Sequence, residues 1–582
     1  MHSLATKSRG LFKNALQTSD KYASRCQKHP CLIWSGVQVM TTRRMAHSGR
    51  SGMSPLGESL YSFSRGRFIW NERQEMAQRY VRFDPEELGA VAASAIGSRS
   101  CVSLERYPDG MYNKAMLLTM CDGKQAVAKI PNPNAGQSHL TTASEVATMD
   151  FMRNTLGIPA PRVYAWCNDA QETRVGAEYI VMEKVEGVPL DTVYGKMPVE
   201  DRFAVTKTVS NYQKTWASTA FESYGGLYYA QDCPHGDPLR FTDRYGAMRE
   251  DAKFAVEPTT GRDWNDDGRR AIRFDRGPWR RAEQYLRAIG ERELSCVEQL
   301  AALPKSQLTL CGPGTYQPTR DKKVKAINCY LDMVDLATPT EDALRKACLW
   351  HCDLHSENIF VNPLKTTEVT AIIDWQSTEI APLFVQARQP HFMDYEGPQL
   401  LGTERPHLPM DYEQLSLAEQ ARVRSLFYLQ SLRALYRTLM QKSAPEIWKS
   451  FEFQQTPTFD LLLFGRNLLV DGEATYMAHL IELLESDSAG WIHSTKDRAI
   501  GSLLREKEEI MADAERALRG MNAMQGIRDR LGDLFPERGV VKPEQYELTK
   551  NALRQVKGEV MAEFAHTDEE KAVWQASWPF DD

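Results

Sequence analysis

The spacing of apolar and polar residues predicts a chain that contains both strands and helices. Short apolar runs that end in polar residues or glycine indicate strands at residues 125–130, 179–182, 359–361 and 369–373. Apolar positions with helical spacing indicate helices at residues 141–149, 199–220, 280–303 and 415–440. Residues 495–565 are densely charged, and we expect long helices there with solvated faces.

The strongest chemical signal lies in residues 351–361, His-Cys-Asp-Leu-His-Ser-Glu-Asn-Ile-Phe-Val, and in the Ile-Ile-Asp-Trp of residues 372–375. Phosphoryl transfer from ATP needs a carboxylate near the acceptor hydroxyl and two oxygen ligands for magnesium, and Asp353, Asn358 and Asp374 have the required spacing. Asn362-Pro363 predicts a turn, so the three residues would lie at the ends of one hairpin. A buried His–Asp pair or a capping Asp explains either part alone, but the joint pattern favours a nucleotide site.

The rest of a nucleotide site is expected upstream of this motif. Lys129 ends the strand at residues 125–130, and Glu145 follows sixteen residues later on a predicted helix, the arrangement of the Lys–Glu pair that orients a phosphate-binding lysine. A solvent-facing lysine is the alternative. Residues 107–114 are expected to cover the phosphates, with Gly110 allowing close approach of backbone N–H groups and Asn113 bracing the loop. Because this loop has a single glycine, the alternative that it is a plain hairpin turn remains open.

Together these strings resemble the aminoglycoside phosphotransferase and choline kinase superfamily, whose members have a small residue between His and Asp and an Asp-Trp or Asp-Phe without the glycine of protein kinases. Cys352 and Asp374-Trp375 match that branch. The resemblance implies an α+β, bilobal protein-kinase-like fold, with a small β-rich N-lobe and a large helical C-lobe. It implies Asp353 as the catalytic base and Asn358 and Asp374 as magnesium ligands. It also implies Lys129 on the ATP phosphates, backbone groups near Glu183 to Val185 on adenine, and His355 as a brace of the loop.

Several further strings resemble one fungal branch of that superfamily, the altered inheritance of mitochondria protein 9 family. They include Lys-Ile-Pro-Asn-Pro from residue 129, Thr-Ala-Ser-Glu-Val-Ala-Thr-Met from residue 142, and Asp-Trp-Gln-Ser-Thr-Glu-Ile-Ala-Pro-Leu-Phe from residue 374. One departure concerns the substrate. The Gly-Asp-Pro that follows the second metal ligand in aminoglycoside-modifying relatives is replaced by Ile-Ala-Pro at residues 380–382, which weakens the case for an antibiotic as acceptor.

The net charge of −6 conceals a basic leader. Residues 1–57 hold nine Lys and Arg against one Asp, or +8, which leaves −14 for the remainder. A leader that is rich in Arg and Ser and poor in acids is typical of a mitochondrial transit peptide, so we expect recognition by the import machinery and localisation in the mitochondrion, in the matrix. A disordered basic tail is the alternative.

Composition excludes several other classes. No apolar run reaches transmembrane length, no nucleic-acid-binding motif is present, and the 11 cysteines show no zinc-type spacing, so we expect free thiols.

The expected division of the chain is a disordered transit peptide (1–57), a nucleotide-binding N-lobe (58–187), a C-lobe with the catalytic and metal loops (188–410) and a C-terminal helical region (411–582). The C-lobe includes an insertion at residues 191–349, with a loop at 237–269 and three aromatic residues that pack or line an acceptor pocket, Trp264, Phe274 and Trp279.

Two functions remain open from the sequence. The first is an ATP- and magnesium-dependent kinase that transfers phosphate to the hydroxyl of an unidentified small molecule. The second is a kinase-like ATP-binding protein of weak or no activity, with a regulatory role in mitochondrial maintenance, which the glycine-poor loop favours. A protein kinase is disfavoured because the chain lacks the Asp-Phe-Gly and Ala-Pro-Glu strings.

Overall fold

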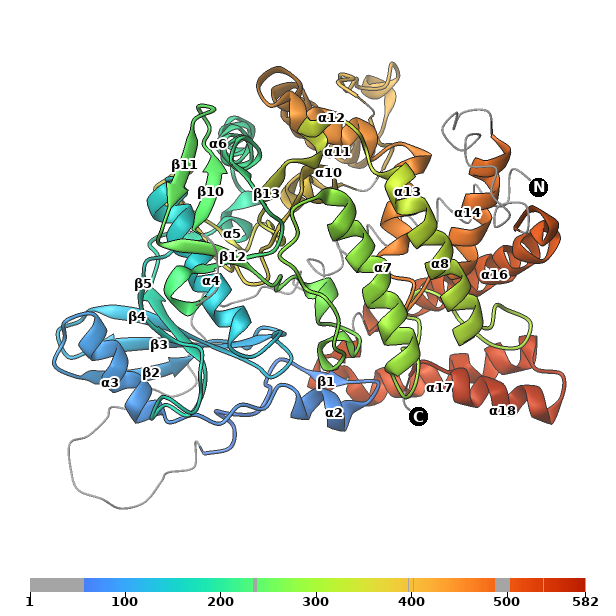
Figure 1. Ribbon diagram of the computed structural model, residues 1–582, viewed down its shortest axis with the longest axis horizontal. Helices are drawn as coiled ribbons and strands as arrows, with labels where there is room; N and C mark the ends of the chain where they lie inside the picture. The colour runs from blue at the N-terminus through green and yellow to red at the C-terminus, as the bar shows by residue number, and fades with distance from the viewer. Residues whose placement is uncertain are drawn as a thin grey trace.

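A computed structural model describes residues 57–233, 238–395, 397–400, 402–486, 503–536 and 539–580. It has a small β-rich lobe, a larger lobe that is mostly helical, and a helical extension at the C-terminal end (Figure 1). The predicted bilobal fold is thereby confirmed. The predicted transit peptide lies outside the described residues, apart from Gly57.

The N-lobe is built on one antiparallel sheet with the strand order β2-β3-β4-β6-β5. Its strands are β2 (Cys101–Arg106), β3 (Asn113–Met120), β4 (Gln125–Pro131), β5 (Val163–Cys167) and β6 (Tyr179–Glu183). Alternate residues of β3 are buried, as expected when one face of a sheet packs on a core. Helix α3 (Pro85–Ala95) begins where Asp84 accepts hydrogen bonds from the N–H groups of Glu86 and Glu87, and α4 (Leu140–Asp150) carries Glu145.

The C-lobe holds the catalytic hairpin against long helices. Strands β14 (Ile359–Asn362) and β15 (Lys365–Ile372) pair as the sequence predicts, with β7 (Val188–Pro189) beside β14. The predicted helices are present as α6 (Val199–Ser218), α7 (Ala282–Gln299) and α11 (Leu417–Ser443), and α8 (Arg320–Ala337) packs on α7. The buried rings of Trp216, Trp350 and Trp375 meet edge to face at the centre of this lobe.

The prediction of a loop at residues 237–269 is wrong for the first two thirds of that range. This segment forms β10 (Leu239–Thr242), β11 (Met248–Asp251) and β12 (Phe254–Glu257), and β10 joins β8 (Ala220–Phe221), β13 (Ala347–Leu349) and β16 (Ile380–Pro382) in one sheet, while β12 pairs with β9 (Gly226–Tyr229). The apolar side chains of Leu239, Phe241 and Phe254 are buried, and that burial outweighs the turn-forming Asp and Gly residues around them.

Helices continue to the C-terminal end. They are α12 (Pro445–Phe453), α13 (Pro457–Gly465), α14 (Glu473–Glu485), α16 (Lys507–Leu531), α17 (Tyr546–Phe564) and α18 (Asp568–Ser577); short helices elsewhere are α2 (Glu72–Ala77), α5 (Leu190–Tyr194), α9 (Asp342–Arg345) and α10 (Leu383–Gln386). α16 and α17 lie within the region where long charged helices were predicted. Strand β1 (Arg67–Phe68) pairs with β17 (Val540–Val541), so the first part of the segment predicted as the N-lobe pairs with the C-terminal region.

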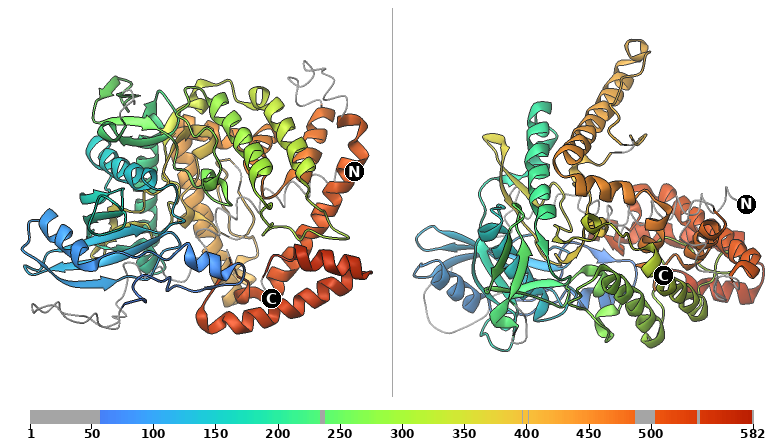
Figure 2. Two further views of the ribbon diagram at one scale, coloured as in Figure 1. Left: turned by 60° about the horizontal axis from the view of Figure 1, so that its bottom comes forward. Right: turned by 45° about the horizontal axis from the view of Figure 1, so that its top comes forward.

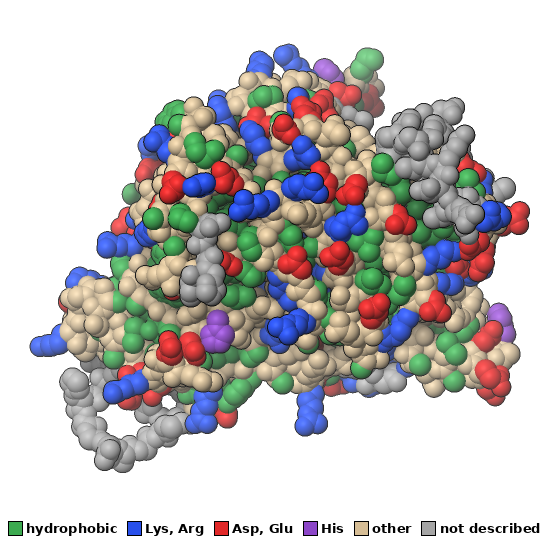
Figure 3. All heavy atoms as spheres, in the orientation of Figure 1, with side chains coloured by type: hydrophobic (Ala, Val, Ile, Leu, Met, Phe, Trp, Pro, Cys, Tyr) green, Lys and Arg blue, Asp and Glu red, His purple; other side chains and the backbone are tan. Residues whose placement is uncertain are grey.

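Two further views show how the helices project and how charge is distributed over one face. In the right-hand view of Figure 2, α11 projects beyond the other helices. Acidic and basic side chains are interspersed over the face in Figure 3. Among the residues that the structure describes, every helix is too short or too polar to cross a bilayer.

Candidate active site

His351 fixes the start of the catalytic loop from within the core. Its ring is fully buried, Nε2 donates to the carbonyl oxygen of Ile373 at 2.9 Å, and Nδ1 accepts from the N–H of Asp353 at 3.2 Å. Burial lowers the pKa of His351, which agrees with a neutral ring that has one donor and one acceptor. The Asp353 backbone is thereby tied to the end of β15.

Asp353 is held as a carboxylate. Burial by itself would raise its pKa, but His355 and then His391 hold the pKa far below the ordinary value for Asp. His355 Nε2 lies 3.4 Å from Asp353 Oδ2, and this contact, working against burial, raises the pKa of His355. The Asp353 side chain keeps 29% of its surface exposed, so a ligand can reach a charged oxygen.

Lys129 joins the two lobes through a three-membered ion cluster. Its Nζ lies 2.7 Å from Glu145 Oε1 and 2.7 Å from Asp374 Oδ1. Burial would lower the pKa of Lys129, but Asp374 and Glu145 outweigh it and raise the pKa. Three residues predicted from separate parts of the chain are therefore in direct contact, and Lys129 is not the solvent-facing residue of the alternative interpretation.

The backbone at Asp374 is left-handed, with φ of 61°. Non-glycine residues adopt this conformation rarely, and it is concentrated at functional sites where the surrounding fold enforces it. Here it comes two residues after the end of β15, and the Asp374 carboxylate contacts Lys129 with 38% of the side chain still exposed.

Asn358 and Asp374 both have side-chain oxygens of the kind that bind metals, and a backbone hydrogen bond joins their two segments. The N–H of Ile373 donates to the carbonyl oxygen of Asn358 at 2.9 Å, and Asn358 Nδ2 donates to the carbonyl oxygen of Asp353 at 2.9 Å. With Nδ2 engaged, the side-chain oxygen of Asn358 is the atom left to act as a ligand. Mg²⁺ is commonly bound by one or two such oxygens plus phosphate oxygens and water. Among the described residues there is no group of three His, Cys, Asp or Glu residues suited to a metal. Magnesium binding by Asn358 and Asp374 stays a prediction.

The loop expected to cover the phosphates is held at its root by a buried carboxylate. Asp109 is completely buried, forms an ion pair with Arg106, accepts from the N–H of Ser64 at 3.0 Å and lies 3.4 Å from Lys114 Nζ. At the turn, the N–H of Gly110 donates to the carbonyl oxygen of Asn113 at 3.0 Å. Gly110 has no positive φ, so the turn does not depend on glycine conformation, and side-chain contacts hold the loop instead.

Asn113 and Gln376 form a reciprocal amide pair between the lobes. Asn113 Nδ2 donates to Gln376 Oε1 at 2.9 Å, and Gln376 Nε2 donates to Asn113 Oδ1 at 3.1 Å. Sequence reasoning expected Asn113 to brace the loop but missed its partner, which lies two residues after Asp374. The direct contact of Asn113 with nucleotide stays a prediction.

The segment between the lobes places Glu183 and Val185 in different surroundings. Glu183 Oε2 accepts from Arg153 Nη1 and from the N–H of Arg162, both at 3.0 Å. The Val185 side chain packs in a small cluster with Phe360, Ala371 and Ile373 of the catalytic hairpin. Both side chains thus fix the connection itself, and the predicted adenine contact remains assigned to backbone groups of residues 183–185.

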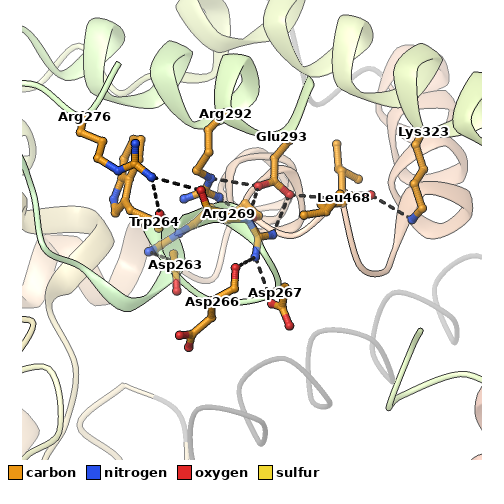
Figure 4. Close-up of polar contacts among 12 residues, drawn as sticks. Asp263, Trp264, Asp266, Asp267, Arg269, Arg276, Arg292, Glu293, Lys323 and Leu468 are labelled. Carbon is orange, nitrogen blue, oxygen red and sulfur yellow. Dashed lines mark hydrogen bonds and ion pairs between the residues drawn. The ribbon is translucent and has the colours of Figure 1, made fainter. Parts of the chain in front are cut away.

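The insertion reaches the site through residues 259–276, which lead from β12 toward α7. Figure 4 shows Arg269 of this segment beside Glu293 of α7. The rings of Trp264 and Trp279 stack at 5.0 Å and both are buried, while Phe274 lies against Trp264 at 6.2 Å, so the three aromatic residues pack together. Of the two alternatives given for these aromatic residues, the structure agrees with packing, whereas the Arg269–Glu293 pair was not predicted.

The site has the parts of a kinase-like phosphotransferase, and comparison with known proteins agrees. The model of the phosphotransferase enzyme family, APH, matches residues 103–223 and 234–385, which include every candidate residue of the site. The part of the chain that carries the site is thus similar to this family.

Particular relatives come from fungi. A subtelomeric hrmA-associated cluster protein of Aspergillus fumigatus is 25% identical over 512 residues, which cover 83% of this chain and 97% of the relative. Altered inheritance of mitochondria protein 9, mitochondrial, of Yarrowia lipolytica is 26% identical over 426 residues, or 68% of this chain and 71% of the relative. Their names bear out the resemblance given above, and the second agrees with the predicted mitochondrial localisation.

Among solved structures, a putative aminoglycoside phosphotransferase from Ralstonia eutropha aligns with 75% of this chain and 99% of its own, at 15% identity and a TM-score of 0.34.

Proposed function

We propose that the protein transfers the terminal phosphoryl group of ATP to a hydroxyl group of a small molecule. The observation that carries the proposal is the contact of Lys129 with both Glu145 and Asp374 at 2.7 Å, next to an ionised and accessible Asp353. Buried charges are costly unless they are paired, and here Glu145 is buried against Lys129 while the carboxylates of Asp374 and Asp353 stay partly exposed.

Each residue has a distinct task in this proposal. Lys129, oriented by Glu145, binds the phosphates, and Asn358 and Asp374 hold magnesium, which supplies charge neutralisation at the phosphate oxygens when bound. Asp353 accepts a hydrogen bond from the acceptor hydroxyl, orients it toward the phosphorus and takes its proton. The low pKa of Asp353 makes it a weak base, so orientation precedes proton transfer, as suits a loose transition state.

The acceptor is an unidentified small molecule. The Ile-Ala-Pro sequence that replaces Gly-Asp-Pro forms β16, which pairs with β13 inside the C-lobe sheet. These side chains are fully buried, and they are used for packing rather than for contact with a substrate. This placement gives no support for an antibiotic acceptor.

The basic leader and the mitochondrial relatives support import into the mitochondrion, and we place the reaction in the matrix. Import machinery is then a transient partner of residues 1–57. The test is accumulation of the chain, tagged at its C-terminal end, in protease-protected mitochondria, with a variant lacking residues 1–57 as the control.

The decisive enzymatic experiment compares wild type with Asp353→Ala. Purified protein is incubated with Mg-ATP and a mitochondrial metabolite extract, and new phosphorylated metabolites are detected by mass spectrometry. We expect Asp353→Ala to abolish transfer and to retain Mg-ATP binding, because it removes the base and no predicted ligand of metal or phosphate. Wild type that binds Mg-ATP and transfers phosphate to nothing would instead support the regulatory ATP-binding protein.

A further inference from the structure

Arg262 lies where the insertion meets the phosphate-covering loop. It begins the short 3-10 helix η3 (Arg262–Trp264), and its guanidinium carbon is 3.3 Å from the centre of the Tyr112 ring. Tyr112 belongs to the tip of the loop, between Gly110 and Asn113. A guanidinium stacked on an aromatic face restrains both groups, because the ring attracts the cation and the planar group matches its surface.

Two hydrogen bonds fix the guanidinium in this position. Arg262 Nη1 donates to the carbonyl oxygen of Ala135 in the N-lobe at 2.9 Å, and Nη2 donates to Asp266 Oδ1 at 2.9 Å. The side chain is only 23% exposed. Arg262 therefore bridges the insertion to the N-lobe at two points, the Tyr112 ring and the backbone that follows β4.

The segment that carries Arg262 is anchored in the C-lobe. Glu293 accepts from Arg269 Nε at 2.8 Å and from Arg269 Nη2 at 3.0 Å, and these two side chains are almost completely buried (Figure 4). Asp263, the residue after Arg262, pairs with Arg466 at 2.6 Å, and Trp264 stacks on Trp279. The position of Arg262 is thus set by a rigid base and not by a freely moving surface loop.

The contact of Arg262 with Tyr112 reaches the tip of the loop from the insertion. Together with the Asn113–Gln376 pair, the tip of the loop is held from the C-lobe at two consecutive residues, Tyr112 and Asn113. A loop that has only one glycine is then kept in place by contacts made across the lobes.

We propose that Arg262 is a positioning residue, which holds the phosphate-covering loop over Lys129 and Asp374 by its contact with Tyr112 and so sets the affinity for Mg-ATP. This inference rests on the proposed function in so far as ATP is the nucleotide. It assigns to the insertion a role on the nucleotide side of the site.

The test measures Mg-ATP binding with a fluorescent ATP analogue in Arg262→Ala, Tyr112→Ala and the double variant of the full chain. We expect each single variant to weaken binding about tenfold and the double variant to be no weaker than either, because both remove the same contact. Tyr112→Phe keeps the ring and should bind as wild type. Arg273→Ala, an exposed arginine of the same segment, is the matched control and should also bind as wild type.

A second measurement separates positioning from general stability and from the proposed function. Amide hydrogen exchange, without nucleotide, should become faster in residues 107–114 of Arg262→Ala and stay unchanged there in Arg273→Ala, with equal melting temperatures. Unchanged exchange or unchanged ATP affinity in Arg262→Ala overturns the inference, as does a hundredfold loss in the double variant. If wild type binds Mg-ATP but transfers no phosphate, only the proposed function is refuted. If wild type does not bind Mg-ATP, the comparison of amide exchange alone decides whether Arg262 holds the loop.

Discussion

Replacement of Glu293 by Ala should cost the protein a large part of its stability. Glu293 is completely buried and accepts four hydrogen bonds, two from Arg269, one from Arg292 Nε at 2.9 Å and one from the N–H of Leu469 at 2.8 Å. Burial alone would raise the pKa of Glu293, but the two guanidinium groups outweigh burial and lower it. The variant would leave two buried cations without their shared carboxylate.

The magnitude of the loss follows from the partners that Arg269 and Arg292 retain in the variant. Removing one partner of a buried ion pair costs ~3–5 kcal/mol, mostly because the remaining charge stays buried. Arg269 still has Asp267 at 3.0 Å, although that carboxylate is 44% exposed, and Arg292 Nη2 still donates to the carbonyl oxygen of Arg466 at 2.7 Å. We therefore expect a loss near the lower end of the range, about 3 kcal/mol.

The assay is urea unfolding followed by tryptophan fluorescence and by circular dichroism. Trp264, one of the 12 tryptophans, lies 4.8 Å from the Arg292 guanidinium, so fluorescence includes a signal from this region. Disagreement between the two probes would show separate unfolding of parts of the chain. Glu291→Ala is the matched control, because it makes the same substitution at an exposed position of α7. A difference between the two variants below about 1 kcal/mol would refute the reasoning, since an uncompensated buried charge costs more than that.

Two other predictions concern pH and the contact between lobes. Burial raises the pKa of the Asp471 carboxyl from 3.8 to about 7, so its contribution to stability is present at low pH and is lost as the pH rises through about 7. Asp471→Asn should be more stable than wild type at pH 8 and gain little at pH 5; equal gains in thermal melts at both values would contradict this assignment. Gln376→Ala removes both hydrogen bonds to Asn113 and should weaken Mg-ATP binding about three- to tenfold, at ~0.5–1.5 kcal/mol per bond with partial compensation by water. A titration that matches wild type would show that the pair does not hold the loop for nucleotide.

Much of the candidate site could be predicted because its parts are local. The catalytic loop, the turn at Asn362-Pro363 and the strand before Asp374 form one hairpin, and the spacing of its polar residues is fixed by that hairpin. Lys129 and Glu145 were found because a strand followed by a helix returns the chain over its own sheet. The contact of Lys129 with Asp374 across 245 residues agreed with the motif, although no local pattern reports it.

Other parts of the site could not be predicted from spacing. Asp109 was not singled out in the loop at residues 107–114, and only its burial against Arg106 and Lys114 shows that it anchors the loop. The strands between residues 239 and 257 were missed because turn-forming residues are frequent there, whereas burial against distant strands decides their conformation. For such segments, tertiary contact outweighs local propensity.

By itself the sequence determined the catalytic hairpin and the identity of the charged residues around it, because these depend on periodicity and on short-range geometry, and its resemblance to a known superfamily implied the fold class. Only the tertiary structure decided how the glycine-poor loop is held. Its supports, Arg262 on Tyr112 and Gln376 on Asn113, come from segments 150 and 263 residues away along the chain. Stacking and amide pairing of this kind require the lobes and the insertion to be assembled, since neither contact has a sequence spacing that would reveal it.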